Sequence, residues 1–148
     1  MVDSDFQVRC VEAGLGKDPE GVRKRLGLMA GGLLIQTAAV EMATNELYVE
    51  MLVAQTYSAI EAGKMLARKK EVDLLLRLAG TTQISAAIAK AGAKGGKPFL
   101  LIIAGSADDV AAAEPELRAI VTRLKRRELD EQELGGIETA ALLNALKG

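Results

Sequence analysis

The chain has 148 residues, of which 49% are hydrophobic and 26% charged, and its formal net charge at pH 7 is −1. This length suits one domain, residues 1–148, and the balanced charge excludes binding of nucleic acid through a general basic surface. The sequence contains no histidine and a single cysteine, Cys10, which excludes histidine-based catalysis, ordinary zinc chemistry and an internal disulfide.

The N-terminal third is expected to place a helix between two strands. Apolar and polar side chains alternate from Phe6 to Val11, as in a half-buried strand, with Cys10 as a small buried residue. Asp18, followed by a proline and a glutamate, is typical of the start of a helix, which we expect to reach Leu26. After two glycines, a second strand is predicted from Leu33 to Ala38.

A long central helix is predicted from Asn45 to Arg68. One apolar strip follows helical spacing and comprises Val49, Leu52, Val53, Thr56, Ile60, Gly63 and Ala67. A second strip on the far side comprises Leu47, Met51, Ala54 and Met65. A helix with two apolar faces is either buried between layers or docked to a partner, and we favour burial.

Residues 71–94 predict two short helices joined by a turn. The first runs from Glu71 to Ala79 and stops at Gly80. Thr81 or Thr82 is expected to cap the second helix, which ends at Gly92 and whose first-turn N–H groups suit an anion such as phosphate. One face of this helix is apolar (Ile84, Ala87, Ile88, Ala91), and the other carries Gln83, Lys90 and Lys94.

The C-terminal third begins with a continuous apolar run from Phe99 to Ala104, which predicts a central strand covered on both faces. Ser106 is expected to cap the next helix, and Pro115 to start a further helical segment to about Arg127. A last helix, Ile137 to Lys147, is expected to follow Gly135 and Gly136 and is apolar almost all round. Its cover is either its own domain, a protein partner or a second copy of the chain.

These elements predict an α/β (α+β) protein with a small mixed β-sheet packed by several α-helices. No pair of residues supports an enzyme mechanism, so we expect a binding or regulatory subunit without catalytic residues, metal or cofactor. The sequence has neither a signal-peptide pattern at its start nor an apolar run long enough to span a membrane. We therefore expect a cytoplasmic protein without a membrane partner.

The segment from residue 74 to residue 94 also carries a family pattern: a hydrophobic stretch into a glycine, a Gln-Ile pair, an Ala-Ile pair and a closing glycine. The matching residues are Leu74, Leu75, Leu76, Gly80, Gln83, Ile84, Ala87, Ile88 and Gly92. In these positions the chain resembles the accessory subunits of the KEOPS (EKC) complex, the TPRKB-like kinase-binding family. The resemblance is best over residues 32–104. Thr82 stands where the family often has arginine and Ala86 where it often has glutamate, and a contact made by that arginine is not carried over to Thr82.

The resemblance implies a non-catalytic subunit of the complex that makes the threonylcarbamoyladenosine (t6A) modification in tRNA. Such a subunit binds and stimulates a small atypical kinase/ATPase and recruits tRNA through its 3′ CCA end. We expect the tRNA phosphates to meet Arg77, Lys90 and Lys94 together with Lys64, Arg68 and Lys69. Gly80, Thr81 and Gln83 would form the turn beside them, and Ile84 and Ala87 would support the site from beneath.

For the kinase, we expect a contact through the last helix, with its apolar residues Ile137, Leu142, Leu143 and Leu146. Two alternatives stay open. The first is a self-associating α/β protein with no RNA role, which would form a homo-oligomer in isolation. The second is a small-ligand-binding regulatory domain, for which we expect a closed apolar pocket near residues 92–98.

Overall fold

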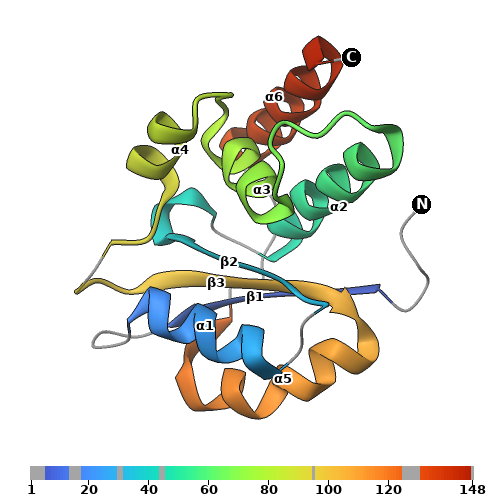
Figure 1. Cartoon of the computed structure of the whole chain (residues 1–148). Helices are drawn as coiled ribbons and strands as arrows, with labels where there is room; N and C mark the ends of the chain where they lie inside the picture. The colour runs from blue at the N-terminus through green and yellow to red at the C-terminus, as the bar shows by residue number, and fades with distance from the viewer. Residues whose placement is uncertain are drawn as a thin grey trace.

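The computed structural model describes residues 6–13, 18–29, 32–43, 46–94, 96–124 and 131–147. Strands and helices alternate along most of the chain (Figure 1). Their bounds are β1 Phe6–Ala13, α1 Pro19–Met29, β2 Leu34–Ala39, a 3₁₀ turn Val40–Met42, α2 Glu46–Ala62, α3 Lys70–Ala79, α4 Ile84–Ala91, β3 Phe99–Ser106, α5 Ala107–Ile120, β4 Val121–Leu124 and α6 Glu131–Lys147. The predicted α/β class, a small sheet packed by helices, is confirmed.

The sheet has the strand order β2-β3-β1-β4, and every pairing among the described strands is antiparallel. The expected mixed sheet is therefore corrected to an antiparallel one. β1 and β3 pair along their whole length, from Phe6 opposite Ser106 to Ala13 opposite Phe99. The units β1-α1-β2 and β3-α5-β4 each join two parallel strands that lie on either side of a third strand, the split β-α-β arrangement.

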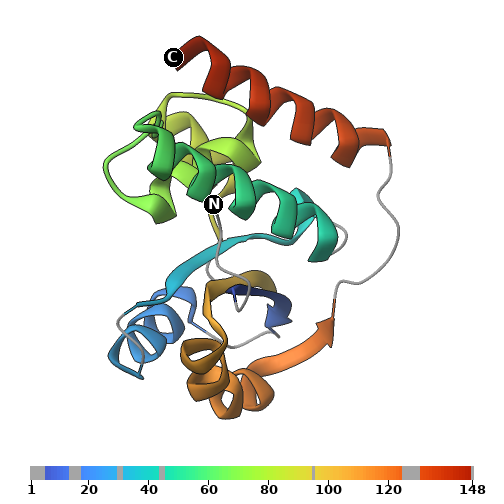
Figure 2. The ribbon, with the colours of Figure 1, turned by 90° about the vertical axis from the view of Figure 1, so that its right-hand side faces the viewer.

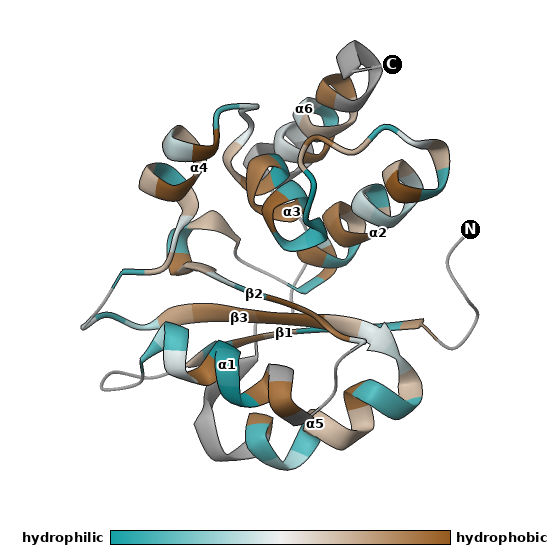
Figure 3. Cartoon of the chain, viewed as in Figure 1, coloured by the Kyte–Doolittle hydropathy of each residue, from teal (hydrophilic) through white to brown (hydrophobic). Residues whose placement is uncertain are grey.

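Helices cover both faces of this sheet. In Figures 1 and 2, α1 and α5 lie on one face, and α2, α3, α4 and α6 lie on the other. β1 supplies both cores, because Cys10 packs under the larger layer and Val11 under the smaller one. Residues Phe99 to Gly105 of β3 are all buried, so the predicted central strand is confirmed, and Figure 3 shows this hydrophobic strand between the two layers.

Several predicted boundaries were wrong. The first helix ends at Met29 rather than at Leu26. The central helix ends at Ala62, where Gly63 takes a positive φ of 68°, rather than at Arg68. The helix predicted to run from Pro115 to Arg127 is instead the end of α5 followed by β4, because residues 121–124 pair with the end of β1. Arg127 lies outside the described residues. The last helix begins at Glu131, so Gly135 and Gly136 lie inside it rather than before it.

The second apolar strip of α2 is not buried, contrary to the prediction. Leu47 is 47% exposed, Met51 is 39% exposed, and Ala54 is also exposed, whereas Met65 is half-buried and lies beyond the end of α2. The first strip packs on the sheet and on α3 through residues such as Val49 and Leu52. One side of α2 therefore completes the core, and the opposite side presents apolar groups to solvent.

Candidate functional site

The turn between α3 and α4 is built by local backbone chemistry. Gly80 ends α3 in the left-handed conformation with φ 72°, and its N–H donates to the Leu76 carbonyl at 2.8 Å, which confirms the predicted stop. The residue that precedes α4 is Gln83, not a threonine, and it makes no side-chain cap. Thr81 contributes differently, since its Oγ1 accepts a hydrogen bond from the Gln83 N–H at 3.1 Å. The predicted threonine cap is corrected to a threonine-stabilised turn.

The face that α4 buries is narrower than the sequence predicts. Only its small residues Ala87 and Ala91 are buried, and they let the helix lie close to α3 and β2. Ile84 and Ile88 are 52% and 55% exposed, so they do not support the site from beneath as expected. They instead lie one turn apart on the surface of α4, where they are accessible to another molecule.

Two cations, Lys90 of α4 and Lys94 just beyond it, are held by helix ends. Lys90 follows Ile88 by two residues, about 200° around the helix, so it projects from a different side of α4 than the isoleucines. Lys90 Nζ donates to the Ala79 carbonyl at 3.0 Å, at the C-terminal end of α3. Lys94 Nζ donates to the Ala89 and Gly92 carbonyls at 2.9 and 3.3 Å, at the end of α4. Helix C-terminal carbonyls stabilise cations, and an ammonium has further donors for an anionic ligand. Both side chains are exposed. We call Ile84, Ile88, Lys90 and Lys94 the α4 surface.

Arg77 does not belong to this surface, contrary to the prediction. Its side chain is completely buried, and Nε donates to Asp73 Oδ1 at 2.6 Å. Nη1 donates to the Ala140 carbonyl of α6 at 3.2 Å. The guanidinium thus lies between α3 and α6, where a tRNA phosphate has no access. A weak sequence signal for this pair existed, because Asp73 and Arg77 are four residues apart in a helix.

The remaining predicted cations lie at the other end of α3. Lys64, Arg68 and Lys69 belong to the loop that precedes this helix, with Arg68 and Lys69 exposed and Lys64 half-buried. Because an α-helix rises about 1.5 Å per residue, Lys69 and Ala79 are roughly 15 Å apart along the axis. The cations therefore form two separate groups rather than the single cluster predicted.

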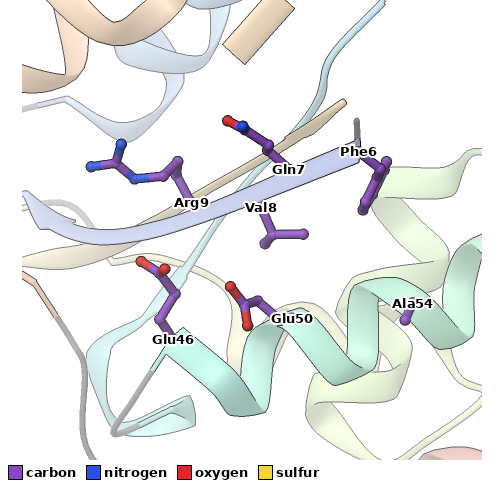
Figure 4. Close-up of a pocket in the computed structure, with 7 residues that line it drawn as sticks. All are labelled: Phe6, Gln7, Val8, Arg9, Glu46, Glu50 and Ala54. Atoms are coloured by element: carbon purple, nitrogen blue, oxygen red, sulfur yellow. The ribbon is translucent and has the colours of Figure 1, made fainter. Parts of the chain in front are cut away.

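A groove of about 500 Å³ lies between β1 and α2 (Figure 4). It is lined by Phe6, Gln7, Val8, Arg9, Glu46, Glu50 and Ala54. Figure 4 shows the carboxyl groups of Glu46 and Glu50 extending from α2 toward β1, and Glu46 also accepts a hydrogen bond from the Cys10 N–H at 3.3 Å. This acidic lining disfavours a phosphate. The groove also lies away from residues 92–98, where the small-ligand alternative placed its pocket.

The α6 residues that were expected to contact a protein partner differ in how far they are exposed. Ile137 is half-buried against the larger core, Leu143 is half-buried, and Leu142 is 60% exposed. The side chain of Leu146 lies outside the described residues. Leu142 is therefore the described leucine of α6 that is most available to a partner.

Within the described part of the chain, no group of three or more metal-ligating side chains could hold an ion, and no helix is long and apolar enough to cross a membrane. The fold and the surface together define an antiparallel, helix-covered α/β protein that presents an apolar and cationic helix. No model of a known protein family matches the sequence, and no curated protein matches it.

Proposed function

We propose that this protein is a non-catalytic, cytoplasmic subunit of the KEOPS t6A complex that recruits the 3′ CCA end of tRNA and binds and stimulates the small kinase/ATPase subunit. In this proposal the RNA lies on the α4 surface and the kinase on α6. The corrected site consists of Gln83, Lys90 and Lys94 with Ile84 and Ile88. Arg77 is no longer included among the RNA-binding residues, because its side chain is buried.

The observation that carries the RNA part is that α4 and its exit expose two isoleucines, Ile84 and Ile88, and two lysines, Lys90 and Lys94. Proteins bind single-stranded RNA ends with cations at the phosphates and with side chains, mostly aromatic, that cover the unstacked bases. On α4 isoleucines would take the place of aromatic side chains. The α4 surface offers both kinds of group within one helix and its exit. Because the whole chain has a net charge of −1, affinity for RNA must come from such a local group of residues.

The kinase part rests on the exposed Leu142 of α6. Exposed large apolar side chains on a packed helix are common at protein interfaces, where they fill pockets of the partner. α6 is held to α2 and α3 on its other side, so Leu142 faces away from its own domain.

The RNA proposal is tested by the binding of labelled tRNA with and without its terminal CCA, at two salt concentrations. We expect the wild type to lose binding when CCA is removed. K90E and K94E should each weaken binding to intact tRNA, whereas K24E should not. Lys24 is an exposed lysine of α1 on the opposite layer, so its reversal changes the net charge by the same amount. If all three variants weakened tRNA binding equally, the binding would depend on the overall charge of the protein and not on the α4 surface.

The kinase proposal is tested by co-purification with the KEOPS kinase subunit. L142E should abolish the interaction and leave the fold intact, because the side chain it replaces is 60% exposed. The matched control is L28E, since Leu28 of α1 is 90% exposed on the other layer. Retention of the kinase by L142E would exclude this contact.

Self-association without an RNA role remains the second candidate, favoured by the exposed strip of Leu47, Met51 and Ala54 on α2. A homodimer through this strip predicts a mass of two chains that persists on dilution and becomes one chain in M51E. Light scattering after size exclusion measures this mass directly. A monomer at all concentrations excludes this alternative.

A further inference from the structure

Among the described contacts of α6, two hydrogen bonds to its backbone join it to its own domain. Gln55 Nε2 of α2 donates to the Ile137 carbonyl at 3.2 Å, and Arg77 Nη1 of α3 donates to the Ala140 carbonyl, also at 3.2 Å. Both acceptors are main-chain oxygens in the middle of α6. Together with the packing of Ile137 and Ala140 in the larger core, these bonds fix the position of α6 along its axis and its rotation about that axis.

Small residues of α6 make this close approach possible. A Cβ at Gly136 would overlap the hydroxyl of the buried Tyr48 on α2. Ala140, one turn later, is fully buried, and Thr139 lies next to Gly80 at the end of α3. Among the described residues, the packed side of α6 is thus formed by Ile137, by small residues and by carbonyls, while Leu142 is 60% exposed. Two adjacent glycines also give α6 little helical stability of its own.

Of the two donors, Arg77 has the more demanding environment. Its side chain and that of Asp73 are both fully buried, and the Asp73 carboxylate also accepts bonds from Thr56 Oγ1 at 2.8 Å and from the Leu66 N–H at 2.7 Å. Asp73 thereby joins α2, the following loop and α3. Arg77 extends this network to α6, because one nitrogen bonds Asp73 while another bonds Ala140.

We infer that Arg77, fixed by Asp73, is the positioning residue of α6, and that it sets the orientation in which the α6 surface around Leu142 is presented. The link to a kinase partner rests on the function proposed above. The positioning itself does not, since it concerns contacts within this chain.

The shape of arginine explains why this residue type serves here. A guanidinium has nitrogen donors that point in different directions, so one side chain reaches both Asp73 and the Ala140 carbonyl. A lysine at position 77 would keep the positive charge and the pair with Asp73, four residues earlier on the helix, but its one nitrogen cannot occupy the separate positions of Nε and Nη1, so a nitrogen paired with Asp73 would not reach α6. R77K therefore separates charge compensation from the positioning of α6.

The test is amide hydrogen exchange on the full chain, followed by mass spectrometry of peptides from α6 and from α3. In R77K, we expect the amides of residues 137–143 to exchange about ten- to a hundredfold faster than in the wild type. This factor corresponds to the free energy of local opening that is lost when a buried hydrogen bond from a charged donor is removed. The amides of α3 should keep their protection. Unchanged protection of α6 in R77K would overturn the inference.

A second variant keeps the inference testable if R77K does not fold. D73N/R77M removes both buried charges and retains similar side-chain volumes, so the core is expected to fold. In this variant the amides of α6 should again exchange faster than in the wild type, and those of α3 should not. Wild-type protection of α6 in this folded variant would also overturn the inference. Co-purification with the kinase subunit then reports on the proposed function separately. Faster exchange with undiminished kinase binding supports the positioning role and rejects α6 as the kinase contact.

Discussion

At the scale of single residues, Asp73 joins α2, the loop that follows it and α3. It is fully buried and receives hydrogen bonds from Thr56, Leu66 and Arg77. A buried carboxylate is tolerated only when it is paired and hydrogen-bonded, and Asp73 meets both conditions. The same pairing removes Arg77 from the surface.

We expect D73N to lower the free energy of unfolding by about 3–5 kcal/mol, because it leaves the Arg77 charge buried without its counter-ion. D73N/R77M should recover most of this loss, since neither charge then remains. Urea unfolding of the three proteins measures both values. A loss below about 1 kcal/mol in D73N would mean that the buried guanidinium finds other compensation.

Tyr57 gives the protein a pH dependence at high pH. Burial, and secondly the nearby charge of Glu71, raise the pKa of this phenol above its ordinary value of 10.0. A raised pKa in the fold means that the neutral phenol contributes stability below pH 10.0, and that this contribution is lost as the pH rises through the folded pKa. Y57F should therefore lose less stability than the wild type between pH 9 and pH 11, as measured by urea unfolding. Equal losses in the two proteins would show that the ionisation of Tyr57 is not coupled to unfolding.

At the scale of elements, the paired glycines of α6 have opposite roles. A Cβ at Gly135 would meet nothing within 4 Å, so G135A should stabilise the protein by about 0.4–1 kcal/mol through the higher helix propensity of alanine. G136A should destabilise it, because the new methyl group would overlap Tyr48. Thermal unfolding of the two variants compares them directly, and each is the control for the other. A gain of stability in both variants would mean that α6 lies farther from α2 than in the structure.

The orientation of α4 predicts a second contrast. I88S removes a side chain that is 55% exposed and should change the free energy of unfolding by no more than about 0.5 kcal/mol. A87L places a larger side chain at a site that is 1% exposed and should cost about 1–3 kcal/mol. Chemical unfolding distinguishes this structure from the sequence-based prediction, in which Ile88 and Ala87 are both buried. A large loss of stability in I88S would favour the sequence-based prediction.

At the scale of the whole molecule, a net charge of −1 restricts RNA binding to local contacts. If Lys90 and Lys94 each neutralise one phosphate of a single-stranded end, the logarithm of the association constant should fall with the logarithm of salt concentration with a slope of about −1.4. K94E should make this slope shallower by about 0.7. A titration series at four salt concentrations measures both slopes. A much steeper wild-type slope would indicate an RNA contact beyond the α4 surface.

Most of the fold could be predicted from the sequence, because periodicity and turn residues act locally. The strand from Phe6, the buried run from Phe99 and the stop at Gly80 were all evident from alternation, an apolar run or a glycine. The candidate site was predicted less well. Lys90 and Lys94 are exposed as expected, whereas Arg77 is buried and Ile84 and Ile88 are not.

The sequence by itself determined the α/β class, the central strand and the position of the α3–α4 turn, because the residues that specify these features lie within a few positions of one another. Only the tertiary structure decided the antiparallel sheet, the strand at Val121–Leu124, the side that α4 exposes and the burial of Arg77. Each of these depends on a partner far along the chain. β1 pairs with β4, small alanines bring α4 close to its neighbours, and the Ala140 carbonyl receives the guanidinium 63 residues away.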